Sequence, residues 1–272
     1  MPVYLAYRQS GVQMIRETDG IKIHYETAGE QGSRVLLLHG WGCDISLMKP
    51  VADALKAEHR VLMIDFPGHG ESGRPPEPWG VPEFAENLEK FLHMVGFAPC
   101  AVIAHSFGCR VAAYIAAEYP EIFTKMIFTG AAGIRPKQSA EAQARTEKYK
   151  KLKKRAEKIK KIPLLRGAAE HMEEKLRKKY GSADYIRLDE DMRKTFVKVV
   201  NQDLTDLYDK IRISTLLIWG EMDTETPIWM GREIESRIAD CALIPLESGT
   251  HFAYLEQIGR FNTIAAHFLK ED

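Results

Sequence analysis

The sequence predicts an α/β fold: a mostly parallel eight-stranded sheet with helices on both faces and an inserted helical lid. Short apolar runs alternate with helical stretches over most of the chain, which is typical of parallel strands joined by crossover helices. Small polar turns, rich in glycine, follow several of these runs. A stretch of about 70 residues without strand-like runs interrupts the alternation late in the chain, which predicts an insertion into the core.

Eight runs have the length and apolar content expected for strands, and they lie at 12–15, 21–25, 34–38, 60–64, 100–104, 125–129, 214–219 and 241–246. Asp19-Gly20 separates the first two runs and predicts a hairpin. Helices are expected at 47–58, 82–95, 111–117, 228–238 and 259–269. We therefore assign 1–134 and 208–272 to the α/β core and 135–207 to a helical cap.

The composition describes a protein that can bury a large core and carries no global signal for nucleic acid. Of 272 residues, 45% are hydrophobic and 9% aromatic, and the formal net charge is zero. The four cysteines are far apart and form no metal-ligand or redox pair, and no pair of histidines and carboxylates has metal spacing, so no cofactor or metal is expected. No apolar run is long enough for a membrane span, and residues 1–8 lack a basic segment followed by an apolar one, so a cytoplasmic location is expected.

One stretch combines a strand, a turn and a helix within a few residues. The apolar run 100–104 continues into a small-residue helix, and Ser106 is left to turn the chain. Such a sharp turn needs small neighbours, and Ala104 and Gly108 occupy those positions. The serine hydroxyl would then stand at a helix N-terminus, whose free N–H groups and dipole favour negative charge. This is where an attacking alkoxide and a tetrahedral oxyanion would form.

The stretch resembles the nucleophile elbow of the α/β-hydrolase superfamily, with Ala104 where the first glycine usually stands. A serine nucleophile needs a base, and the base needs an orienting carboxylate. We choose His251, in a small polar loop after the last predicted strand, and Asp223, which follows the seventh. The order Ser106, Asp223, His251 is that of the superfamily, and each residue follows the carboxyl end of a predicted strand.

Other carboxylates and histidines compete for these roles. Glu221 and Glu225 flank Asp223, but the glycine-x-x-aspartate pattern favours Asp223. His105 adjoins Ser106, and a packing role is expected because its side chain would point the other way. His69 lies in a glycine-rich turn near Asp65 and is expected to be structural. Five other histidines are expected to be solvated: His24, His59, His93, His171 and His267.

An oxyanion hole requires two backbone N–H groups, one after the nucleophile and one from the loop after the third strand. The resemblance assigns these to Phe107 and Trp41, because His39-Gly40-Trp41-Gly42 is similar to the superfamily's His-Gly-x motif; an ordinary turn is the alternative. His39 is expected to shape this loop by hydrogen bonds. Together with His39, the aromatic residues Trp41 and Phe107 are also candidates for the wall of the substrate pocket.

The predicted cap is strongly basic. Residues 135–179 contain 17 Lys or Arg and 6 Asp or Glu, an excess of 11 positive charges. Tyr149, Leu152, Ala156 and Ile159 recur at helical spacing with lysines between them, which predicts a basic amphipathic helix. A lid helix with a solvated lysine face explains this pattern, and attraction of anionic substrates or of an anionic membrane surface are alternatives.

These features favour a serine hydrolase that cleaves a small-molecule carboxylic ester through an acyl-enzyme. Ser106 would attack the carbonyl, His251 would transfer the proton, and Asp223 would orient His251. The same triad serves carbon–carbon bond hydrolases, thioesterases, peptidases, perhydrolases and acyltransferases, whereas a serine at 106 argues against haloalkane dehalogenation. Some members of the superfamily act instead as small-molecule receptors. The sequence leaves the substrate and the oligomeric state open.

Overall fold

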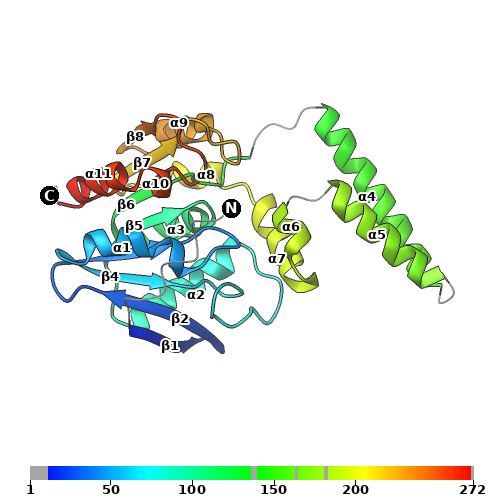
Figure 1. The fold of residues 1–272 in the computed structure, drawn as a ribbon, viewed down its shortest axis with the longest axis horizontal. Coiled ribbons are helices and arrows are strands. Elements are labelled where there is room, and N and C mark those ends of the chain that lie inside the picture. Colours follow the sequence, from blue (N-terminus) through cyan, green and yellow to red (C-terminus); the bar gives the residue numbers. More distant parts are fainter. Residues whose placement is uncertain (1–11, 136–139, 163–164, 181–182, 271–272) are drawn as a thin grey trace. The chain divides into compact units, whose positions relative to one another are not determined.

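The described residues contain one eight-stranded sheet in the order β1-β2-β4-β3-β5-β6-β7-β8 (Figure 1). The computed structural model describes residues 12–135, 140–162, 165–180 and 183–270; residues 1–8, used above for the location, lie outside these ranges. The pairs β1–β2 and β2–β4 are antiparallel, and the remaining pairs are parallel. The strands are β1 (Val12–Thr18), β2 (Ile21–Ala28), β3 (Ser33–Leu38), β4 (His59–Ile64), β5 (Cys100–His105), β6 (Phe123–Thr129), β7 (Thr215–Gly220) and β8 (Cys241–Leu246). The predicted sheet is confirmed.

Alternating side chains of the central strands enter two separate cores, one on each face of the sheet. In β3, Leu36 and Leu38 belong to one buried cluster, whereas Val35 and Leu37 belong to the other. This follows from the two-residue period of a strand and explains why a doubly covered strand is apolar throughout. The first face is covered by α2 (Val81–Met94), α3 (Phe107–Glu118) and α9 (Ile228–Arg237), and the second by α1 (Lys49–Leu55) and α11 (Ile258–Lys270).

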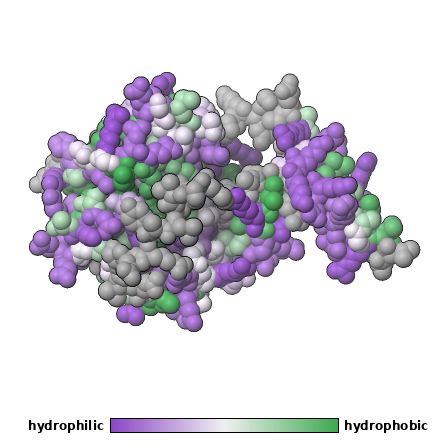
Figure 2. Space-filling view, viewed as in Figure 1, coloured by the Kyte–Doolittle hydropathy of each residue, from purple (hydrophilic) through white to green (hydrophobic). Residues whose placement is uncertain are grey.

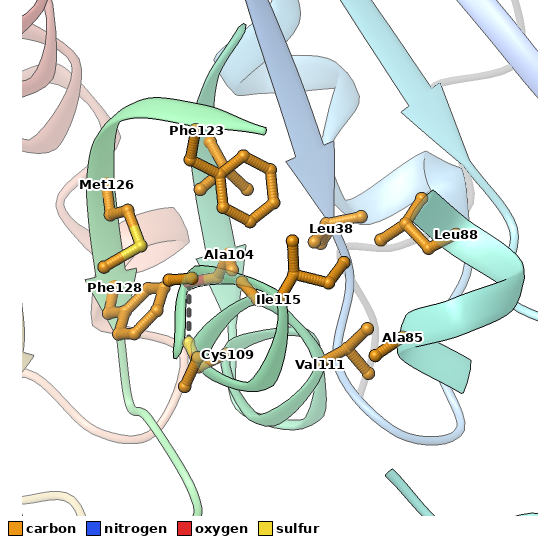
Figure 3. Packing of buried hydrophobic residues seen from close by; sticks show 14 of the residues in the cluster. Leu38, Ala85, Leu88, Ala104, Cys109, Val111, Ile115, Phe123, Met126 and Phe128 are labelled. Carbon is orange, nitrogen blue, oxygen red and sulfur yellow. Dashed lines mark hydrogen bonds between the residues drawn. The ribbon is translucent and has the colours of Figure 1, made fainter. Parts of the chain in front are cut away.

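Small residues let α3 lie close to the centre of the sheet. Figure 3 shows Val111 and Ile115 of α3 among the core side chains of the first face, with Val111 beside Ala85 of α2. The Cys109 thiol donates a hydrogen bond to the carbonyl of Ala104, 3.1 Å away, which ties the first turn of the helix to the end of β5. The position of α3 relative to β5 is therefore fixed by packing and by this bond.

Two histidines that the sequence analysis expects to be solvated are buried, so that expectation is wrong. His24 Nδ1 lies 2.6 Å from Asp65 Oδ2, and His59 Nδ1 lies 2.8 Å from the Ser33 hydroxyl. Burial of an imidazole is tolerated because each ring has a hydrogen-bonding partner. Asp65 also accepts hydrogen bonds from backbone N–H groups that follow β3 and β4, so it organises the turns at this edge of the sheet.

The region 136–197 forms a compact unit separate from the rest of the chain, and we call it the insertion. It contains α4 (Ala140–Lys160), α5 (Arg166–Tyr180), α6 (Ala183–Arg187) and most of α7 (Glu190–Asn201). The helices α4 and α5 form an antiparallel hairpin, because Arg145 donates to the carbonyl of Lys179 at one end and Lys160 pairs with Glu173 nearer the other. The described helices include none long and apolar enough to cross a membrane.

The predicted cap extends to residue 207, but residues 198–207 group with the core. The physical reason is a set of hydrogen bonds that these residues make with core elements. The buried Arg110 guanidinium of α3 donates to the carbonyls of Val199 and Gln202. The N–H of Leu204 donates to the carbonyl of Gly133, 2.9 Å away, just before the insertion begins. The chain therefore leaves and re-enters the core at neighbouring points.

Candidate active site

Ser106 occupies a strained turn between β5 and α3. Its φ is 49° and its ψ is −104°, a positive-φ conformation that residues with a Cβ rarely adopt. The turn persists because both of its flanking elements are packed: a Cβ on Gly108 would lie 2.8 Å from the Cβ and from the carbonyl oxygen of Leu38. Gly108 is thus required by close packing, as the sequence predicts. Ser106 itself is partly exposed and lies immediately before the first turn of α3.

Asp223 and His251 come from different loops at the carboxyl ends of β7 and β8, and they form a hydrogen-bonded pair. Nδ1 of His251 lies 2.8 Å from Oδ2 of Asp223. The carboxyl side chain is fully buried, whereas the imidazole is 15% exposed. Burial raises the pKa of Asp223, but the hydrogen bond and charge of His251, with the hydrogen bonds from Thr226, outweigh it and hold that pKa below its ordinary value. A carboxylate in this state can orient an imidazole and stabilise its protonated form.

Thr226 is a member of this cluster that the sequence analysis missed. Its hydroxyl donates to Asp223 Oδ2 over 2.8 Å, and its N–H donates to Oδ1 over 2.9 Å. Glu225 N–H donates to Oδ1 as well, so Asp223 closes the turn before α9 with its own side chain. The sequence signal for this arrangement is an aspartate three residues before a Thr-Pro pair that precedes a helix. Asp223 is buried, whereas Glu225 is exposed.

The end of β6 lies against both Ser106 and His251. The N–H of Ser106 donates to the carbonyl of Thr129, 3.1 Å away. The next residue, Gly130, has a φ of 55°, and a Cβ there would lie 3.0 Å from Nδ1 of His251. The three predicted triad residues therefore share one edge of the sheet. Among the described residues, Asp223 and His251 are joined by a hydrogen bond, whereas Ser106 and His251 are not. Catalytic hydrogen bonds are often long before substrate binds.

The loop after β3 approaches the serine closely. A Cβ on Gly40 would lie 2.9 Å from the His105 ring and 3.4 Å from Ser106 Cβ. This proximity requires a glycine and brings the next residue, Trp41, beside the turn. Phe107 is the first residue of α3, where backbone N–H groups lack partners within the helix. The two N–H groups that the sequence predicts for an oxyanion hole thus belong to adjoining segments.

His39 is a structural residue rather than part of a pocket wall. Its side chain is fully buried, so its inclusion among the substrate-pocket candidates is wrong. Nε2 accepts a hydrogen bond from the N–H of Phe66, which leaves Nδ1 to donate to the carbonyl of Gly40. Burial, helped by the nearby His69, lowers the pKa of His39 to about 3, so the ring is neutral at ordinary pH. These bonds shape the loop, as the sequence analysis expects.

The side chain of Phe107 is also buried, so its candidacy for the pocket wall is wrong. Only 2% of Phe107 is exposed, and its ring packs edge-on against Trp41, Phe66 and Phe84. An aromatic side chain at the first helical position is drawn into the core because that core lies directly under the turn. What Phe107 can offer a ligand is its backbone N–H. Trp41 is partly exposed and stays a candidate for the wall.

His105 supports His251 by packing. The two rings are 4.7 Å apart between centroids, and His105 also contacts the rings of Phe252 and Tyr254. Burial and the proximity of His251 lower the pKa of His105 to about 3, and its Nδ1 lies 3.1 Å from the carbonyl of Thr129. The ring is therefore neutral and donates to that carbonyl. The expected packing role of His105 agrees with these contacts.

Comparison with known proteins places this arrangement in a family. A model of the alpha/beta hydrolase fold matches residues 33–257, which include both the β3 loop and the β8 loop. The chain therefore belongs to the α/β-hydrolase fold family. Its sheet order, its strand–turn–helix at Ser106 and the positions of Asp223 and His251 after β7 and β8 are consistent with that membership.

Curated relatives match only part of the chain. Epoxide hydrolase 4 of Mus musculus is 33% identical over 111 residues, which are 40% of this chain and 31% of that protein. The dihydrolipoyllysine-residue acetyltransferase component of an acetoin cleaving system from Pseudomonas putida is 31% identical over 110 residues, 40% of this chain and 30% of that protein. The chain thus matches less than a third of the length of these relatives.

Solved structures match over nearly the whole chain. A hydrolase from Pseudomonas aeruginosa PA01 has a TM-score of 0.73 at 22% identity, covering 97% of this chain and 100% of that one. The enol-lactonase from Burkholderia xenovorans LB400 has a TM-score of 0.73 at 20% identity, covering 95% of this chain and 100% of that one. At these identities the similarity establishes the fold.

Proposed function

We propose that this protein is a serine hydrolase that cleaves carboxylic esters of small molecules. Ser106 attacks the ester carbonyl while His251 takes its proton, and the backbone N–H groups of Trp41 and Phe107 stabilise the oxyanion. His251 then returns the proton to the leaving alcohol. Water attacks the acyl-serine in a second step, with His251 again acting as the base. Asp223 keeps the proton of His251 on Nδ1, so that Nε2 is available to the serine.

The pairing of Asp223 with His251 carries this proposal. A buried carboxylate with a depressed pKa beside an imidazole that is still partly exposed is the arrangement that a general base requires. A solely structural pair would have both partners buried, as in the pair His24–Asp65 of the same protein. The strained, partly exposed Ser106 at the same edge of the sheet supports the role of nucleophile.

Among hydrolase substrates, esters suit this site better than epoxides. A serine that opened an epoxide would form an ether, which has no carbonyl for water to attack, so the covalent intermediate would persist. An acyl-serine retains its carbonyl and can be hydrolysed with the same oxyanion stabilisation. The enol-lactonase among the structural neighbours acts, by its name, on an ester. The structure of a meta-cleavage product hydrolase also matches this chain, with a TM-score of 0.70, and for that reason carbon–carbon bond hydrolysis is our second candidate.

The proposal is tested with a panel of p-nitrophenyl esters that differ in acyl length and charge. We expect multiple turnovers of at least one ester by the wild type and loss of turnover in Ser106→Ala. Ser236→Ala serves as the matched control, because Ser236 is an exposed serine on α9 that bonds only within its helix. Mass spectrometry of the rapidly quenched reaction should find the acyl group on the peptide that contains Ser106.

Two outcomes would contradict the proposal in different ways. Ester turnover that survives in Ser106→Ala would exclude this serine as the nucleophile. A single slow turnover, with the product retained and a partner protein recruited, would identify a small-molecule receptor instead of an enzyme. Turnover of a meta-cleavage product with no turnover of any ester would select carbon–carbon bond hydrolysis.

A further inference from the structure

Two apolar side chains are exposed close to the C-terminal end of α4 and the N-terminal end of α5. Ile162 is 49% exposed and Leu165 is 42% exposed. By contrast, Ala156 of α4 and Ala169 of α5 are buried. The hairpin therefore has enough internal apolar contact to be a compact unit without the side chains at its turn. Figure 2 shows a mainly hydrophilic surface over the insertion, with some hydrophobic surface at the end of the hairpin where α4 ends and α5 begins.

Positive charge surrounds these exposed side chains. Between positions 148 and 166 the sequence contains ten Lys or Arg residues and one acid, Glu157. Lys160 and Arg166 pair with Glu173 and Glu170 of α5. Several other cations are exposed and form no ion pair with any described residue: Lys151, Lys153, Lys154, Arg155, Lys158 and Lys161. Their charge is thus available to an external anionic surface.

We propose that the exposed side chains of Ile162 and Leu165, with those of Lys158 and Lys161, form a docking surface for an anionic lipid bilayer. Ile162 and Leu165 enter the boundary between headgroups and acyl chains, while Lys158 and Lys161 contact the anionic headgroups. Apolar side chains at a turn combined with a surrounding cluster of cations fit the interface of a bilayer, which offers both an apolar interior and a negatively charged surface. The protein lies on the membrane in this proposal. The inference does not depend on ester hydrolysis.

A polyanion such as RNA would account for the lysines but not for the exposed apolar pair. An RNA backbone attracts cations, and its contacts to an aliphatic side chain at a turn add little. A bilayer uses both properties, so the two partners predict different responses to substitution of Ile162 and Leu165. Charge complementarity together with apolar exposure therefore favours lipid.

Cosedimentation with vesicles tests the proposal on the whole chain. The vesicles are phosphatidylcholine alone or phosphatidylcholine with about one third phosphatidylserine. We expect binding to the anionic vesicles at low salt, weak binding to the neutral ones, and a decrease in binding as salt screens the charges. The double variant Ile162→Ser/Leu165→Ser should bind about tenfold more weakly or worse. In the double variant Lys158→Glu/Lys161→Glu, the loss of each positive charge should weaken vesicle binding roughly fivefold, and the two introduced negative charges should weaken it further.

Two variants with substitutions at exposed positions of the α/β unit, outside the insertion, serve as matched controls. Ile15→Ser replaces a side chain of β1 that is 54% exposed, and Arg16→Glu/Arg260→Glu reverses two exposed cations; both should bind vesicles like the wild type. Far-UV circular dichroism verifies that each variant is folded. Equal binding to neutral and anionic vesicles would overturn the proposal. Absence of vesicle binding would also overturn it. The same holds if Ile162→Ser/Leu165→Ser binds both single-stranded RNA and vesicles as the wild type does.

Discussion

The Thr226 hydroxyl and the His251 imidazole share one oxygen of Asp223: each lies 2.8 Å from Oδ2. Thr226 is buried and immediately precedes α9, and its hydroxyl also lies 3.3 Å from Nδ1 of His251, so it contacts both members of the pair. Thr226→Val keeps the shape and removes the hydroxyl. We expect kcat/KM for the best ester to fall about tenfold, the cost of one hydrogen bond to a charged group, and Thr226→Ser to restore it. Unchanged kinetics in Thr226→Val would show that the hydroxyl has no part in positioning Asp223.

Replacement of the carboxylate itself should be far more damaging. Asp223→Asn preserves the size of the side chain, but its amide can donate to Nδ1 and favours the wrong tautomer of His251. By analogy with serine proteases, turnover should fall on the order of 10⁴-fold. Glu221→Gln and Glu225→Gln are the matched controls, because both glutamates are exposed neighbours of Asp223. Steady-state ester hydrolysis distinguishes the three, and a comparable loss in either glutamine variant would transfer the acid role to that residue.

The strain at Ser106 predicts that glycine gives a more stable protein than alanine at this position. Ser106→Ala and Ser106→Gly both delete the hydroxyl, but only glycine adopts a φ of 49° at low steric cost. Ser106→Gly should therefore be more stable than Ser106→Ala by about 1 kcal/mol, and both should be inactive. Thermal unfolding of the two variants measures the difference. A less stable glycine variant would mean that its added freedom in the unfolded chain outweighs the relieved strain.

Buried neutral histidines make stability depend on pH. Burial and the charge of His251 depress the pKa of His105 to about 3, whereas an unfolded chain has a histidine pKa near 6.5. Between these values the unfolded state binds the additional proton, so stability is full above about pH 6.5 and decreases as pH falls toward 3. His105 alone contributes a slope of up to about 1.4 kcal/mol per pH unit.

Urea unfolding of wild type and His105→Gln at a series of pH values checks this prediction. The variant has no group at position 105 that titrates in this range, so its free energy of unfolding should fall less steeply between pH 6 and pH 4. The comparison uses slopes because the substitution also changes packing. Parallel slopes would show that His105 takes up its proton in the folded state.

The sheet could be predicted because its strands are short, apolar and separated by distinct helical stretches. Asp19-Gly20 identified the first hairpin, and both residues adopt the positive φ that such a turn requires. Small residues around Ser106 identified the turn between β5 and α3. These features depend on neighbours along the chain, so local sequence contains the information.

What could not be predicted depends on contacts between distant segments. His24 lies on β2 and becomes buried because Asp65, 41 residues later, faces it. The same applies to Phe107, whose ring meets Trp41 and Phe84 from other elements, and to Thr226, whose role requires the histidine loop. The boundary near residue 198 is also determined at a distance, by the guanidinium of Arg110. Burial of a polar side chain is decided by its partner, and the partner is not visible in a local pattern.

The bond between Leu204 and Gly133 joins the two core segments that flank the insertion in the sequence. A segment attached in this way can be lengthened, shortened or replaced without altering a strand pairing, because the core residues on either side of it are already held together by this bond. Change in this region is therefore separated from change in the candidate site residues that follow β5, β7 and β8. Such a chain can exchange one continuous piece of sequence while it keeps all the strands of its sheet.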